Sequence, residues 1–164
     1  MTEEQLTIVD EKDQITGYMS KSKVLDQRLL HRGTSILVLN SKGEIFVHQR
    51  AKSKPIFPGY YDMFVGGGVA QGETYESNAR KELEEELGVD AELQFLFKMR
   101  YTDKQIDCFV SVFKCSTDAK IKLQKEEIIH GKFLSFKKLN ELIKKEKFCT
   151  DSLMIFQRIT EEHL

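Results

Sequence analysis

The sequence is poor in cysteine and proline, and it contains no long apolar run. Its three cysteines include no C-x-x-C pair and are odd in number, so neither a disulfide framework nor a zinc site is expected. Cys108 and Cys115 lie in an apolar run, which predicts small buried side chains. Both prolines fall within 50–61, which is therefore predicted to be a loop. Every apolar run is far shorter than the roughly 20 residues that cross a bilayer, so no membrane span is expected.

Net charge is nearly absent as well. The 164 residues carry 25 basic and 26 acidic side chains, for a net charge of −1. This balance gives no electrostatic reason to expect binding to a nucleic acid polymer or to a membrane surface. Residues 1–13 are acidic and lack the apolar stretch of a signal peptide. These features predict a cytoplasmic protein.

Hydrophobic patterning predicts a single α/β domain of the α+β kind over residues 1–164. At this length one core forms without disulfides or structural metal, and no repeat or linker divides the chain. Apolar runs and alternation predict strands at 6–9, 15–19, 34–39, 44–49, 62–65, 93–101, 106–115 and 132–136. The turn 40–43 is expected to join the third and fourth strands as a hairpin. Helices are predicted at 20–25, 74–87, 139–147 and 151–162.

The most informative segment is 67–89, which reads GGVAQGETYESNARKELEEELGV. Its glycine turn precedes a predicted helix in which Glu82, Glu85 and Glu86 occupy one face. Like charges at this spacing destabilise an isolated helix by about 0.2–0.5 kcal/mol per pair. A solvated acidic helix is the alternative, but it does not account for the glycine turn. The cluster is therefore predicted to hold a cation, and carboxylates suit Mg²⁺.

This segment resembles the Nudix box of the Nudix hydrolase superfamily. One position departs from the motif, because Lys81 stands where the family has arginine. The resemblance implies the Nudix fold, a mixed β-sheet sandwiched between helices. The matching positions are Gly67, Glu73, Glu82, Leu83, Glu85, Glu86, Gly88 and Val89.

The resemblance also implies roles for individual residues. The metal ligands are expected to be Glu82, Glu85, Glu86 and the carbonyl of Gly66, holding Mg²⁺ with Mn²⁺ as an alternative. In some members the glutamate matching Glu82 is the general base, and in others a glutamate of a later loop, for which Glu126 and Glu127 are the candidates here. The loop is expected to be supported by Gly67 and by an ion pair between Glu73 and Lys81.

The first sixty residues are similar to the isopentenyl-diphosphate-isomerase-like branch of the superfamily. In that branch, basic residues matching Arg50 and Lys54 contact the diphosphate, and the triplet DSL at 151–153 is similar to some of its hydrolases. The isomerases carry a catalytic cysteine and a metal-binding histidine in the glycine turn. Gly66 and Gly68 occupy those two positions, which argues against isomerase chemistry.

We therefore expect a Mg²⁺-dependent hydrolase that cleaves the diphosphate linkage of a nucleoside diphosphate joined to another group, or of a similar small molecule. The alternatives are an isopentenyl-diphosphate isomerase and a catalytically silent nucleotide-binding module. His31 and Asp107 match isomerase metal ligands, but their partners are missing, so a structural role is expected for His31. The oligomeric state stays open, a homodimer included.

Overall fold

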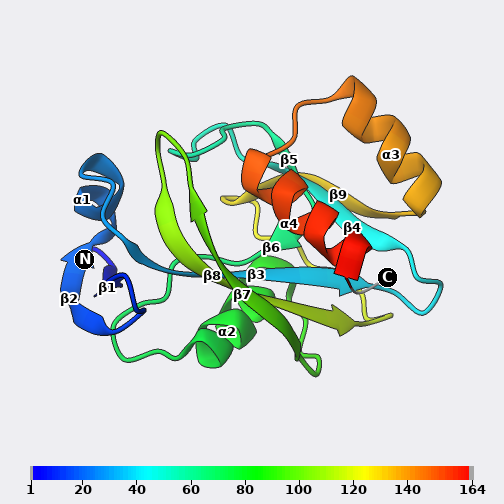
Figure 1. The fold of residues 1–164 in the computed structure, drawn as a ribbon. Coiled ribbons are helices and arrows are strands. Elements are labelled where there is room, and N and C mark those ends of the chain that lie inside the picture. Colours follow the sequence, from blue (N-terminus) through cyan, green and yellow to red (C-terminus); the bar gives the residue numbers. More distant parts are fainter. Residues whose placement is uncertain (1, 163–164) are drawn as a thin grey trace.

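The computed structural model describes residues 2–162, which form a mixed β-sheet covered by helices (Figure 1). The helices are α1 (Lys21–Asp26), α2 (Tyr75–Leu87), α3 (Phe136–Lys145) and α4 (Thr150–Glu162). The strands are β1 (Gln5–Val9), β2 (Ile15–Ser20), β3 (His31–Leu39), β4 (Ile45–Arg50), β5 (Tyr61–Asp62), β6 (Phe64–Val65), β7 (Gln94–Thr102), β8 (Asp107–Ser116) and β9 (Ile128–Leu134). The predicted α+β class and the sheet between helices are confirmed.

Each central strand sends alternate side chains to the two faces of the sheet, as strand geometry requires. In β3, Ile36 and Val38 join the core beneath α2, whereas Leu37 joins the core beneath α3 and α4. The helices lie on opposite faces in Figure 1, with α2 on one side and α4 on the other. Two apolar layers result, and α2 contributes the predicted buried stripe of Ala79, Leu83 and Leu87.

The predicted hairpin between 34–39 and 44–49 is only partly right. β3 and β4 share a single registered pair, Leu39 with Ile45. β3 instead pairs in parallel with β8 along its whole length, and β4 pairs antiparallel with β9. A local turn signal does not encode partners that come much later in the chain, so the sequence pattern missed this separation.

The strands β5 and β6 cross the gap that opens between β3 and β4. β5 pairs with β4 through His48 and Asp62, and β6 pairs with β3 through Ile36 and Val65. The glycine turn 66–68 follows β6 directly. The separation of the two central strands therefore creates the space beside which the glycine turn lies.

Two predicted element boundaries are wrong near the C-terminus. The strand predicted at 132–136 is β9, which spans Ile128–Leu134, and α3 begins at Phe136 rather than at Leu139. Ser135 ends the extended segment, because its side chain accepts a hydrogen bond from Lys138 N at 3.3 Å and caps the helix. The cap was not anticipated, since the apolar pattern continues through it.

The cysteines are free thiols and are buried, which confirms the prediction for Cys108 and Cys115. Burial raises the pKa of the Cys115 thiol to about 11, so the thiol stays protonated at neutral pH. In the part of the chain that the structure describes, no helix has the length and apolar character needed to cross a bilayer.

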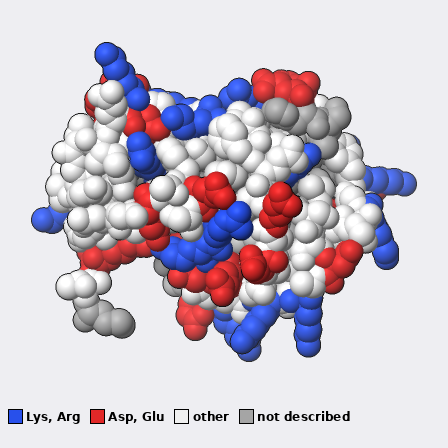
Figure 2. Space-filling view, turned by 90° about the horizontal axis from the view of Figure 1, so that it is seen from below, with Lys and Arg blue, Asp and Glu red and all other residues white. Residues whose placement is uncertain are grey.

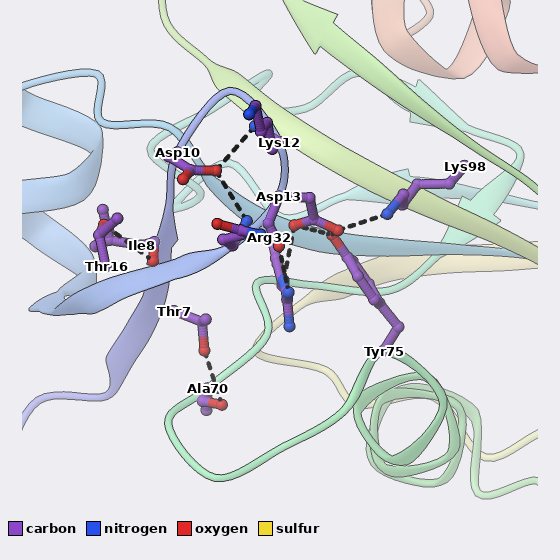
Figure 3. Close-up of polar contacts among 11 residues, drawn as sticks. Thr7, Ile8, Asp10, Lys12, Asp13, Thr16, Arg32, Ala70, Tyr75 and Lys98 are labelled. Atoms are coloured by element: carbon purple, nitrogen blue, oxygen red, sulfur yellow. Dashed lines mark hydrogen bonds and ion pairs between the residues drawn. The ribbon is translucent and has the colours of Figure 1, made fainter.

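The turn between β1 and β2 is fastened to three other elements by one carboxylate (Figure 3). Asp13 accepts hydrogen bonds from Arg32 Nε at 2.8 Å, Lys98 Nζ at 2.6 Å and the Tyr75 hydroxyl at 2.9 Å. Burial opposes ionisation of Asp13, but these three donors outweigh it and lower the pKa of the carboxyl. The contact joins the N-terminal hairpin to β3, β7 and α2.

Candidate active site

A cavity of about 290 Å³ opens where β3 and β4 separate. This volume is near the roughly 300 Å³ lower end of the range for small-molecule sites. Its walls come from the N-terminal hairpin and α1, the start of β3, the end of β4, the glycine turn, α2 and the start of α4. Elements that are distant in sequence therefore meet around one cavity.

The glycine turn needs glycine for two separate reasons. Gly66 has a φ of +153°, and a Cβ atom there would lie 2.0 Å from the carbonyl oxygen of Thr34. At Gly67 a Cβ atom would lie 2.8 Å from Glu82 Oε1, so the absence of a side chain lets the carboxylate approach the turn. The turn thus presents backbone to the cavity directly beside an acidic side chain.

A network of hydrogen bonds fixes the turn against α2. Lys81 Nζ lies 2.5 Å from Glu73 Oε1, so the predicted ion pair is present. The other oxygen of Glu73 accepts hydrogen bonds from Ala70 N at 2.9 Å and from Asn78 Nδ2 at 2.8 Å. Asn78 is fully buried, and its Oδ1 accepts a hydrogen bond from the Thr34 hydroxyl at 2.6 Å. Sequence reasoning missed Asn78, which reads locally as an ordinary polar helix residue.

The helix that carries the glutamates has well-defined ends. Thr74 accepts a hydrogen bond from Ser77 N, and Ser77 Oγ accepts one from Thr74 N, which completes a capping box. At the other end Gly88 takes a left-handed conformation with φ 65°. These caps fix where α2 begins and ends, while the buried stripe of Ala79, Leu83 and Leu87 sets the direction in which its acidic face points.

Glu82, Glu85 and Glu86 all line the cavity. Glu86 is buried, with 8% of its surface exposed, and burial together with the charge of Glu82 raises its pKa well above the usual 4.5. Burial also raises the pKa of Glu82 to about 7. Among the described residues, none of the three side chains has a hydrogen-bond or ion-pair partner. A buried carboxylate without a partner is costly, and a bound cation would remove that cost.

The donor set fits a hard divalent cation such as Mg²⁺, which prefers carboxylate and carbonyl oxygens. The side chains are not yet assembled around one point, because no group of three His, Cys, Asp or Glu side chains within residues 2–162 converges as metal ligands do. A cation bound here would therefore draw the flexible glutamate side chains together. Gly66 also lines the cavity, so its carbonyl lies in the same space.

The cavity is far more acidic than the protein as a whole. The complete chain is nearly neutral, and acidic and basic side chains are interspersed on the face seen in Figure 2. Around the cavity, seven acidic residues stand against three basic ones, an excess of four. They are Glu4, Asp62, Glu82, Glu85, Glu86, Glu127 and Asp151 against Lys21, Arg50 and Lys54.

The predicted substrate-binding residues reach the cavity but make contacts within the protein. Arg50 donates to the carbonyl of Ile56 through Nε and Nη2, at 3.2 and 2.9 Å, and its Nη1 lies 3.8 Å from Asp62 Oδ2. Lys54 forms an ion pair with Glu127, the predicted alternative base. Glu126, in contrast, is exposed and does not line the cavity.

Further polar residues line the cavity, and the sequence predicted no role in the site for them. Asp62 and Asp151 both line it, and burial followed by the charge of Asp62 raises the pKa of Asp151 to about 7. His48 lies beside them with 3% of its surface exposed, and its Nδ1 atom has no hydrogen-bond partner among the described residues. Asp62 and His48 looked like ordinary strand residues, so only the fold reveals their proximity.

His48 should make the stability of the protein dependent on pH. Burial lowers its pKa from 6.5 to about 4, so the unfolded chain binds a proton between these values and the folded chain does not. The contribution of His48 to stability should be complete above pH 6.5 and fall as the pH approaches 4, whereas the raised pKa values of Glu82, Glu86 and Asp151 act in the opposite direction in both proteins. Between pH 7.5 and 5, the free energy of unfolding of wild type should therefore fall by about 2 kcal/mol relative to that of His48→Gln. Urea unfolding in EDTA measures it.

The matched control is His130→Gln, since His130 is exposed and lies opposite Gln49 in the β4–β9 ladder. That variant should keep the pH dependence of the wild-type protein. An identical pH dependence in His48→Gln and wild type would show that the neutral His48 ring does not carry the effect.

The residues matching isomerase metal ligands do not form a site. His31 is buried in β3, its Nδ1 lies 2.8 Å from the carbonyl of Leu29, and burial lowers its pKa. Asp107 is held by Arg100 through two hydrogen bonds of 2.9 and 2.8 Å. The glycine turn supplies no thiol or imidazole, so the geometry does not support alkene protonation.

Comparison with known proteins agrees with this geometry. The family model of the NUDIX domain matches residues 29–153. An uncharacterized Nudix hydrolase of Pseudomonas aeruginosa, PA4841, is 37% identical over 151 residues, which cover 92% of this chain and 89% of that protein. Isopentenyl-diphosphate Delta-isomerase 1 of Photorhabdus laumondii is 33% identical over 156 residues, which cover 90% and 89%.

A solved structure extends the comparison to three dimensions. The crystal structure of DR0079 from Deinococcus radiodurans superposes with a TM-score of 0.81 at 28% identity, covering 94% of this chain and 98% of that one. Family match, relatives and fold all point the same way. The chain belongs to the Nudix hydrolase superfamily, in its isopentenyl-diphosphate-isomerase-like hydrolase branch, and is a pyrophosphohydrolase.

Proposed function

We propose that this protein is a cytoplasmic, Mg²⁺-dependent hydrolase of the diphosphate linkage in a nucleoside diphosphate joined to another group, or in a similar small molecule. The observation that carries the proposal is the acid-rich cavity with three glutamates on α2 whose side chains have no partner within residues 2–162. An anionic diphosphate entering this cavity alone would be repelled. Divalent cations bound between the carboxylates and the phosphates would offset this repulsion. Mn²⁺ can replace Mg²⁺ in the same oxygen-rich site.

In this proposal Glu82, Glu85, Glu86 and the carbonyl of Gly66 hold the metal. When bound, the cation polarises phosphoryl oxygens and makes water a better nucleophile. The capped helix and the hydrogen-bonded turn hold the backbone of the metal ligands in place. The site therefore needs little reorganisation as negative charge develops on the substrate. The ion pair of Glu73 with Lys81 supports this arrangement, because it ties the turn to the same helix.

Glu82 is proposed as the general base, with Glu127 as its alternative. Glu82 lines the cavity directly beside the glycine turn, where a carboxylate can reach a water held against the substrate. Glu127 is paired with Lys54, and it gains a free carboxylate only when that lysine turns to another anion. Lys54 and Arg50 are proposed to bind the substrate's phosphate oxygens, for which the guanidinium geometry is well suited.

The substrate class is tested with a panel of diphosphates. We expect hydrolysis of at least one of the nucleoside di- and triphosphates, nucleotide sugars, dinucleoside polyphosphates or prenyl diphosphates when Mg²⁺ or Mn²⁺ is present, and none in EDTA. Phosphate release and product analysis identify the bond that breaks. Absence of turnover across the panel, with nucleotide binding by calorimetry, would favour a silent module, and conversion of isopentenyl to dimethylallyl diphosphate would favour an isomerase.

A further inference from the structure

A group of polar residues in the cavity suggests what the enzyme recognises besides phosphate. We infer that Asp62 and Asp151, together with His48, form a specificity subsite that accepts hydrogen bonds from hydroxyl or amino groups of the moiety joined to the diphosphate. The inference rests on the proposed function, since it concerns the rest of the same substrate. It predicts a polar, donor-bearing group and excludes an alkyl or prenyl chain at this position.

Asp62 presents one oxygen to the cavity. Its Oδ1 is occupied by the backbone N–H of Phe64 at 2.9 Å, which fixes the orientation of the carboxylate. Its Oδ2 lies 3.8 Å from Arg50 Nη1, beyond hydrogen-bond distance. That oxygen therefore retains the capacity to accept a hydrogen bond from a ligand.

Asp151 reaches the same space from the first turn of α4. One of its oxygens, Oδ1, accepts the N–H of Ser152 at 2.9 Å, and Ser152 Oγ accepts the N–H of Met63 at 3.0 Å. These contacts tie the start of α4 to the strand segment that carries Asp62. The two carboxylates are therefore held on rigid elements rather than on a loop, as recognition of a defined group requires.

His48 provides an independent sign that a ligand belongs here. It lies opposite Asp62 in the β4–β5 ladder, lines the cavity and is almost completely buried. Buried polar atoms normally have partners, yet its Nδ1 has none among residues 2–162. A ligand group in the cavity would supply the missing hydrogen bond.

Chemistry restricts what this ligand group can be. Two carboxylates beside one arginine repel a further anion. An alkyl chain would leave the acidic oxygens buried without partners, and each unsatisfied buried acceptor weakens binding. Hydroxyl groups of a sugar and amino groups of a base both supply the required donors.

The test compares substrates that differ in donors. Wild-type kcat/KM should be at least about tenfold higher for nucleoside diphosphates or nucleotide sugars than for an alkyl or prenyl diphosphate, since a site built to bind donors rejects analogues without them. Asp151→Asn should reduce that ratio at least about fivefold by lowering kcat/KM for the donor-bearing substrate, and Asp62→Asn should lower the same value. Comparing kcat/KM between ribose and deoxyribose substrates, and between substrates with amino-bearing and carbonyl-bearing bases, identifies which donor is bound.

Asp90→Asn is the control, because Asp90 is exposed after α2 and does not line the cavity. It should leave the substrate ratio unchanged. Equal kcat/KM values for both substrate types in wild type would overturn the subsite and leave the hydrolase proposal intact. If no diphosphate is hydrolysed, the proposed function fails, and calorimetry with the same compounds and Mg²⁺ tests the subsite. Equal affinities in wild type and Asp151→Asn would then overturn the subsite as well.

Discussion

Glu86→Gln is expected to reduce kcat by roughly 10²–10³-fold at saturating Mg²⁺, because the metal's stabilisation of the transition state amounts to several kcal/mol. The same change should leave the free energy of unfolding without metal unchanged or raise it slightly. Glu86 is buried without a hydrogen-bond or ion-pair partner in the described part of the chain, so ionisation of its carboxyl destabilises the folded protein. Steady-state kinetics and urea unfolding in EDTA measure the two effects.

The opposite signs of these effects separate a metal ligand from a structural residue. A residue that merely packs would lose stability together with activity. Mn²⁺ binding, followed by the loss of its free electron paramagnetic resonance signal, should weaken at least about tenfold in Glu86→Gln. Glu84→Gln serves as the control, since Glu84 is exposed on the same helix and does not line the cavity. A Glu86→Gln enzyme with wild-type kcat and metal affinity would refute the assignment.

The central motif was predictable because its information is local. The spacing of Ala79, Leu83 and Leu87 determines which face of α2 is buried, and the glutamates follow from that rotation. The N-cap Thr74 and the terminal Gly88 lie where the sequence places them. Short-range chemistry thus predicted the helix, its ends and the acidic face that borders the cavity.

The remainder of the site depends on contacts between distant parts of the chain. β3 takes β8 as its parallel partner, and no turn or cap in the sequence specifies that pairing. The subsite joins Asp62 of β5 to Asp151 of α4, and no pattern in the sequence distinguishes Asp62 from a surface aspartate. The resemblance of the DSL triplet to some hydrolases marked Asp151 but gave no position in space. Such clusters become visible only when the topology is known.

The N-terminal hairpin shows how a remote contact could support the site. Thr7 N donates to the carbonyl of Val69 at 2.9 Å, and Gln71 N donates to the carbonyl of Gln5 at 2.8 Å. β1 therefore runs beside the chain that follows the glycine turn, while Leu6 lines the cavity itself. Whatever anchors this hairpin also stabilises one wall of the active site.

Asp13→Asn is expected to lower the free energy of unfolding by about 2–3 kcal/mol, or the melting temperature by about 5–10 °C. Asparagine preserves the shape of the side chain and tolerates the positive φ of 61° at this turn, so the change isolates the charge. The carboxylate side chain is only 8% exposed, and its loss leaves Arg32 and Lys98 without their anion. The value lies below that of a fully buried pair because Lys98 is partly exposed to solvent.

Asp10→Asn is the matched control in the same turn (Figure 3). Among residues 2–162, the side chain of Asp10 accepts hydrogen bonds only from the exposed N–H groups of Lys12 and Gln14, so its loss of charge should cost less than about 1 kcal/mol. Because the hairpin forms a wall of the cavity, Asp13→Asn should raise KM more than it lowers kcat when both are measured well below its melting temperature. Equal unfolding free energies for Asp13→Asn and wild type would mean that these ion pairs only offset their own desolvation, and the hairpin would then be held by β1 pairing alone.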